Sequence, residues 1–153
     1  MKYLIVLYLL FSSNLIAKDI QINDVRVLFE KSATDEVSCK ILLAALNHYN
    51  ESNNTTLAAY KACATMMMAN YCFNPFRKFS YFNKGKSLLE KCIIQESENI
   101  EARYLRYAIQ SSSPRYLGYN KSIQEDKEFL LNNLSTLSDR KLKHMIVSFL
   151  KSS

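Results

Sequence analysis

The chain has 153 residues, of which 48% are hydrophobic and 22% charged, values that suit one globular domain and leave too little chain for two separate cores. Only two Gly and two Pro are present, which argues against an all-β fold and against a glycine-rich phosphate loop. The formal net charge is +6, and the basic residues are scattered without a run of five or more. Such scattering is typical of solvated helix faces, so we expect no nucleic-acid partner.

The first seventeen residues have the pattern of an export signal. Met1 and Lys2 give a positive start, residues 3–11 form an uninterrupted apolar run, and a more polar segment ends at Ala17. A retained membrane anchor is the alternative, but the apolar run is about half of the roughly 20 residues that span a bilayer. We therefore expect a signal peptide over 1–17 and a single helical domain over 18–153. The mature protein would be periplasmic or secreted, with no integral membrane segment.

The chain after the signal predicts helices in succession. Residues 22–29 form a short amphipathic segment, and Asp35 and Glu36 then suit the positive end of a second helix. The predicted apolar stripe of that helix is Val37, Ile41, Leu42, Ala45 and Tyr49. A third helix over 55–71 is apolar nearly all round, which predicts that it lies between neighbours, with its Met residues as core filling.

The segment 74–99 has the clearest helix signals. Asn74 can accept hydrogen bonds as an N-cap, and Pro75 suits the first helical position. One predicted face carries Phe76, Phe79, Phe82, Gly85, Leu89, Cys92 and Ile93. We expect this face to pack on another helix, and Gly85 to face the helix over 55–71.

The remaining segments complete an all-α fold of about six to seven antiparallel helices. Ser97 and Glu98 open a helix that ends near Ser111, and residues 112–120 hold both a Pro and a Gly and form the longest predicted break. Ser122 and Glu125 have the spacing of a capping box. A last helix over 139–150 has clean helical periodicity and is expected to close the domain.

Two small residues seven positions apart, Gly85 and Cys92, flank the bulky Leu89 and precede a new helix that begins near Ile100. This order over 81–108 resembles the second half of a tetratricopeptide repeat (TPR) and its connection to the next repeat. Ser97 stands where the family usually has Pro, and no Trp opens a repeat. The whole chain is also similar to a group of small exported helical proteins of Gram-negative bacteria. The resemblance implies a stack of helical hairpins and protein binding.

No catalytic, cofactor or metal motif is recognised. The two histidines, His48 and His144, lie far apart, and neither belongs to an HExxH motif or a Cys/His cluster. A possible partner surface is formed by Arg103, Arg106, Tyr107, Arg115, Tyr116 and Tyr119. A second possible surface is basic and aromatic, with Arg77, Lys78, Tyr81, Lys84 and Lys86. The alternative for both is a solvated helix face with loop packing.

Two functional hypotheses follow. The first is an exported, monomeric, TPR-like module that binds an unknown peptide or protein partner without cofactor or catalysis. The second is an exported enzyme or small-ligand protein that uses Cys63 or Cys72 in a pocket between helices. Four cysteines in an exported protein also allow a disulfide, for which only Cys39 and Cys63 are predicted to lie close enough. The alternative is that all four are small buried residues.

Export predicts that the mature protein begins at or near Lys18, which N-terminal sequencing of protein from the producing cell measures directly. Membrane-embedded protein that retains Met1 would instead identify the segment as an anchor.

Overall fold

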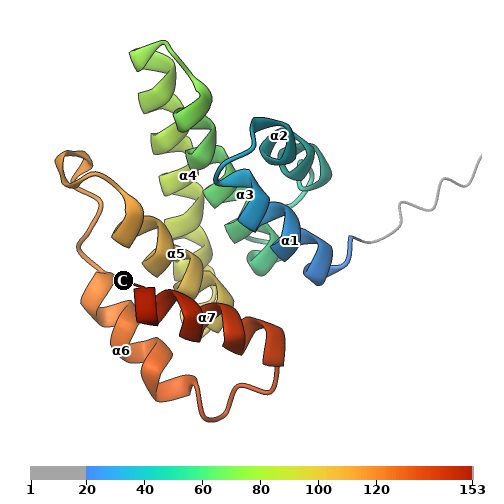
Figure 1. Ribbon diagram of the computed structural model, residues 1–153, viewed down its shortest axis with the longest axis vertical. Helices are drawn as coiled ribbons and strands as arrows, with labels where there is room; N and C mark the ends of the chain where they lie inside the picture. Colours follow the sequence, from blue (N-terminus) through green and yellow to red (C-terminus); the bar gives the residue numbers. More distant parts are fainter. Residues whose placement is uncertain (1–19, 153) are drawn as a thin grey trace, which may run out of the picture.

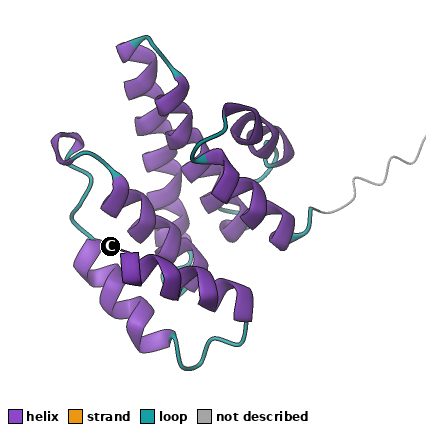
Figure 2. Ribbon diagram, in the orientation of Figure 1, coloured by secondary structure: helices purple, strands orange, loops and turns teal. Residues whose placement is uncertain are grey.

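The computed structural model describes residues 20–152, and this range contains seven α-helices, two short 3-10 helices and no strand (Figures 1 and 2). The α-helices are α1 (Ile22–Ser32), α2 (Glu36–Ala45), α3 (Thr55–Met67), α4 (Pro75–Gln95), α5 (Ile100–Ser112), α6 (Ile123–Asn133) and α7 (Arg140–Ser152). The 3-10 helices are η2 (Met68–Tyr71) and η3 (Arg115–Leu117). The predicted all-α class is confirmed, whereas the predicted signal peptide over 1–17 lies outside the described residues.

The helices form three successive hairpins, α1 with α2, α3 with α4, and α5 with α6 (Figure 1). The first helices of these hairpins contact one another in series, α1 on α3 and α3 on α5, and α7 packs on α5. Helix α3 therefore has α1, α2, α4 and α5 around it, which confirms the prediction that it lies between neighbours. Within residues 20–152, every helix is too short or too polar to cross a bilayer.

The predicted N-cap is confirmed at two helices and is wrong at a third. Asp35 accepts from the backbone N–H groups of Val37 and Ser38, and Asn74 accepts from those of the two residues after Pro75. The capping box at Ser122 is wrong, because its side chain makes no cap hydrogen bond. Its backbone N–H instead donates to the side chain of Gln110 at 3.0 Å, so a neighbouring helix satisfies the group that a capping box would have satisfied.

Helices α3 and α4 approach each other most closely at Gly85. A Cβ atom added there would overlap the Ala62 carbonyl oxygen and lie 2.9 Å from the Met66 backbone nitrogen. The facing surface of α3 is built from small residues, and Ala62 and Cys63 are fully buried. Gly85 therefore faces α3, as predicted, because only a residue without a side chain lets the two backbones come this close.

Two predicted apolar stripes are only partly buried. In α4, Phe82, Leu89, Cys92 and Ile93 are buried as expected, but Phe76 is 84% and Phe79 59% exposed. In α2, Val37 and Ile41 face solvent, and the buried side is formed by Ser38, Cys39 and Leu42. The two phenylalanines lie near the start of α4, where every residue from 73 to 80 is exposed and the hairpin extends beyond its neighbours (Figure 1).

A buried ion pair joins the ends of the domain. Arg26 of α1 donates from Nε and Nη2 to the Glu101 carboxylate of α5 at 2.7 and 2.8 Å, and the Tyr60 hydroxyl of α3 donates to the same carboxylate at 2.5 Å. Asp139, whose side chain caps α7, lies 2.9 Å from Arg26 Nη2. Burial alone would lower the pKa of Arg26, but these two carboxylates raise it above its usual value. The guanidinium thus stays charged and links four helices.

Replacing Gly85 by Ala should destabilise the protein by about 1–3 kcal/mol, because the added methyl group overpacks the α3–α4 contact. At an exposed helical position the same change would stabilise, since Ala has the higher helix propensity. Denaturant unfolding measures the effect, with Ser87→Ala on an exposed position of α4 as the control. A Gly85→Ala protein as stable as its parent would contradict the close approach.

Candidate functional site

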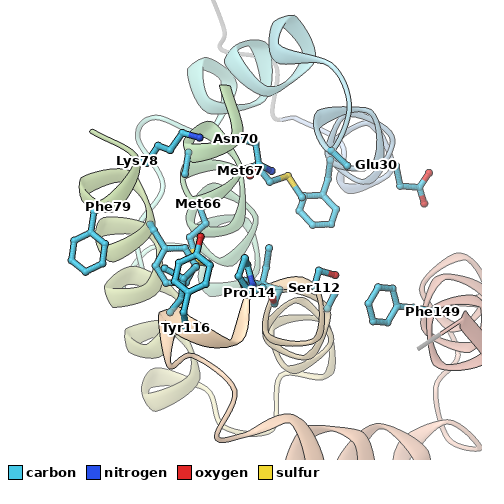
Figure 3. A pocket seen from close by; sticks show the side chains of 18 of the residues that line it. Glu30, Met66, Met67, Asn70, Lys78, Phe79, Ser112, Pro114, Tyr116 and Phe149 are labelled. Atoms are coloured by element: carbon cyan, nitrogen blue, oxygen red, sulfur yellow. Dashed lines mark hydrogen bonds between the residues drawn. The ribbon is translucent and has the colours of Figure 1, made fainter. Parts of the chain in front are cut away.

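An apolar groove with a volume of about 560 Å³ is present within residues 20–152. Its walls come from the C-terminal end of α1, the start of α4, the end of α5 with η3, and one residue of α7, and the end of α3 with η2 forms its floor. Figure 3 shows Met66 and Met67 between Phe79 of α4 and Phe149 of α7, with Pro114 and Tyr116 along one edge. The groove thus collects side chains from all three hairpins and the closing helix.

The groove surface is mainly hydrocarbon and aromatic. Phe149 packs edge-to-face against Tyr104 and Tyr107, with ring centroids 6.1 and 5.6 Å away. Phe82 does the same with Tyr119 at 6.0 Å. These pairs order the rings that the groove presents, because edge-to-face geometry is the favoured arrangement of aromatic side chains.

A few polar groups interrupt this surface. Burial raises the pKa of Tyr104 to about 12, so its hydroxyl stays protonated at neutral pH. Tyr104 is one of the residues that line the groove, and its hydroxyl is a hydrogen-bond donor. Glu30 on the α1 wall and Lys78 on the α4 wall add opposite charges at the edges. Apolar walls with a small number of polar groups are typical of binding sites.

The sequence-predicted partner surface is divided by the fold. Tyr116 is 86% exposed at the groove edge, and Arg115 beside it is also exposed. The other four residues are buried: Arg103, Arg106, Tyr107 and Tyr119. Only Arg115 and Tyr116 therefore offer an accessible surface, and a role for them in partner binding stays a prediction.

The buried arginines of α5 are held by carboxylates of α4 and α6. Arg106 donates two hydrogen bonds to the fully buried Asp126, at 2.7 and 2.8 Å, and a third to Glu90 at 3.1 Å. Arg103 donates to Glu125 at 2.7 Å. The Tyr119 hydroxyl donates to Glu90 at 2.5 Å, and burial followed by this carboxylate raises the tyrosine pKa. These charges fix α6 against α5 instead of meeting a partner.

The second predicted surface, basic and aromatic, is mostly accessible. Arg77, Lys78 and Lys84 are exposed, whereas Tyr81 is half-buried. Lys86 lies over the Tyr119 ring, 5.0 Å from its centroid, and so contributes to packing between α4 and the loop after η3.

The four cysteines carry free thiols in the structure. Cys39, Cys63 and Cys92 are buried, which agrees with small packing residues, and the Cys39 thiol contacts the Ala64 carbonyl oxygen at 3.3 Å. Burial raises the pKa of Cys39 to about 11 and that of Cys92 to about 12, and it raises that of Cys63 well above its usual value. A protonated, buried thiol is a poor nucleophile, so Cys63 is badly placed for the covalent chemistry of the second hypothesis.

Comparisons with protein families, curated proteins and solved structures found no match to this chain. The TPR-like identity therefore stays a prediction. Within residues 20–152, no group of three or more His, Cys, Asp or Glu side chains is placed to hold a metal ion.

Sequence reasoning missed most of the groove. Phe29, Tyr104 and Phe149 line the groove, and the sequence places them on three separate helical segments without indicating that these segments meet. Their periodicity identified an apolar face on each helix, but the faces do not close completely around one another. One usable signal was the third helix, which is apolar nearly all round. When neighbouring helices cannot cover all of such a surface, the uncovered part lines a groove.

The thiols should differ strongly in reactivity. At pH 8 a maleimide should label one site, the partly exposed Cys72, rapidly, and the other three should react on the timescale of unfolding, because their raised pKa values leave little thiolate. Mass spectrometry of the labelled protein measures this, with Cys72→Ser as the control. In denaturant without reductant all four should react, and only two reactive thiols would instead reveal a disulfide.

Proposed function

We propose that the protein is an exported, TPR-like interaction module that binds an apolar segment of a peptide or protein partner and has no catalytic activity of its own. The observation that carries the proposal is the groove, whose apolar walls come from α1, α4, α5 and α7 and whose floor comes from α3 and η2. The serial contacts of α1, α3 and α5 support the TPR-like part, because stacked hairpins present the first helix of each pair on one face.

The lining indicates what kind of segment would bind. Met66 and Met67 give a polarisable apolar floor that can adapt to several side-chain shapes, and Phe82 adds an aromatic ring on the α4 wall. Leu, Met or aromatic side chains spaced at three or four residues on a partner helix would fill such a groove. The Tyr104 hydroxyl would bind a backbone carbonyl or a side-chain oxygen of that segment.

The groove edges favour one orientation of the partner. Lys78 lies on the α4 wall and Glu30 on the α1 wall, so an acidic residue of the partner would lie near α4 and a basic one near α1. Tyr116 and Phe79 are large, mostly exposed rings at the edges, and such rings often dominate binding energy at interfaces. Arg115 beside Tyr116 would add a cation to this edge.

A small apolar ligand is the second candidate. The groove volume of about 560 Å³ lies in the range typical of small-molecule sites. A ligand of this kind would remain with the purified protein, and native mass spectrometry would detect it as added mass.

A photoreactive amino acid at Ser112, an exposed position that lines the groove, should crosslink one discrete partner chain in intact producing cells. The same amino acid at Ser135, which is exposed and does not line the groove, should not capture that chain. Adding Ala69→Trp to the Ser112 protein should fill the groove and reduce the crosslinked yield at least about tenfold.

Ala44→Trp, on an exposed position of α2 that does not line the groove, is the matched control and should leave the yield unchanged. Thermal unfolding of both Trp variants checks that the fold is kept. Capture of the same chain from Ser112 and Ser135 alike, or a yield that Ala69→Trp does not change, would contradict groove binding.

A further inference from the structure

The tip of the α3–α4 hairpin, residues 73–84, exposes an unusual amount of aromatic surface. Phe73 in the connecting loop is fully exposed at 102%, Phe76 is 84% exposed, and Phe79 is 59% exposed. Two of these rings lie in the first two turns of α4, where the hairpin projects beyond the other α-helices and residues 73–80 are all exposed, although η2 packs on another side of α4 (Figure 1). Large aromatic side chains gathered on one projecting segment mark an interaction surface.

The charge of the same region has one sign. The sequence from Asn54 to Leu89 contains no Asp or Glu. Arg77, Lys78 and Lys84 are exposed, and none of the three has a salt-bridge partner within residues 20–152. The carboxylates nearest the base of the tip are Asp35 and Glu36, whose charges add to the effect of burial in raising the pKa of Tyr71. Both already have partners at the start of α2, since Glu36 pairs with Lys40 at 2.8 Å and Asp35 caps the helix.

A small depression on the tip gathers polar donors. It has a volume of about 190 Å³ and is lined by Arg77, Ser80, Tyr81 and Lys84, which follow one another at helical spacing on α4. Two cations and two hydroxyl groups on one face suit a phosphate group. At about 100° per residue, Arg77 and Lys84 lie about a quarter of a turn from Phe76 and more than a third of a turn from Phe79, so the helix presents an apolar face and a cationic face side by side.

We propose that the α3–α4 tip docks the protein on the surface of a membrane that contains anionic lipids. Phe73 and Phe76 would enter the boundary between headgroups and acyl chains, where aromatic rings of peripheral proteins lie about 5–10 Å deep. Lys84 lies about 14 Å along the helix from Pro75, which places it at the level of the lipid phosphates. Arg77 lies only about 3 Å along the helix from Pro75, and its long side chain can extend back toward the phosphates while its stem stays beside the rings. The exposed cations supply the attraction to anionic headgroups and the rings supply the insertion.

The shape of the tip favours a lipid surface over other anionic partners. Its apex is convex and carries unpaired phenyl rings, which gain free energy only where they enter an apolar phase. A nucleic acid would attract the same cations but would leave the apex ring of Phe73 in water. The tip also forms one wall of the groove through Pro75 and Phe79, so docking would hold the groove next to the membrane.

The chain has no Trp, so Phe73→Trp creates a single fluorescent reporter at the apex of the tip in the otherwise unchanged full chain. Its emission should shift to the blue on vesicles that are about one third phosphatidylglycerol in phosphatidylcholine, and lipids brominated near the headgroup should quench it. Leu131→Trp, on an exposed position of α6, is the matched reporter and should not shift. The fluorescence of each Trp reports only its own surroundings. Binding of the apolar run over 3–11 to the vesicles would therefore not explain a shift at residue 73 that is absent at residue 131.

Reversing the three cations, as Arg77→Glu, Lys78→Glu and Lys84→Glu together, should weaken vesicle binding of the Phe73→Trp protein roughly a hundredfold. Phe76→Ser in the same protein should weaken it about tenfold while keeping the charge. These residues are exposed, and circular dichroism on heating checks that the variants fold. No shift on anionic vesicles, an equal shift of both reporters, or a shift with RNA in the absence of lipid would overturn the proposal.

Discussion

The close approach of α3 and α4 at Gly85 is the contact on which the rest of the fold depends. The absent side chain lets α4 pack directly on the backbone at Ala62 and Met66, which makes this hairpin the most extensive helix pair of the described residues. The other hairpins pack on α3, so a shift of α4 would move the walls of the groove. The position of Met66 shows the link, since it contacts Gly85 on one side and lines the groove on the other.

Local signals predicted helix starts because their chemistry is complete within a few residues. Asp35 and Asn74 cap their helices as expected, since an N-cap needs only the backbone of the next turn. The stripe through Phe76 and Phe79 was predicted to be buried and is exposed, because periodicity identifies an apolar face but not how far a neighbour extends along it. The start of α4 therefore has the apolar pattern of a buried helix face, although Phe76 and Phe79 lie beyond the neighbours that would cover them.

Buried charge limited the prediction of the site. Arg106 and Arg103 were taken as surface residues because arginine is rarely fully buried without a partner. Their partners, Asp126 and Glu125, lie on a different helix, and nothing in local spacing shows that α6 brings them into reach. The same pairing explains the missing capping box, since Glu125 binds Arg103 instead of closing its own helix start. Tyr116 stayed accessible because η3 lies outside the helix stack.

The ion pair of Arg26 also constrains the order in which the domain can form. Its acceptor, Glu101, lies 75 residues further along the chain, and Asp139 lies later still. An arginine buried without these carboxylates is strongly unfavourable, so α1 cannot settle until α5 and the start of α7 are in place. The α3–α4 hairpin needs only contacts between neighbouring segments and can form early. Helix α1, the first of the described helices to be synthesised, is therefore among the last to dock, and a chain cut before α7 would keep α1 loose and open to proteases.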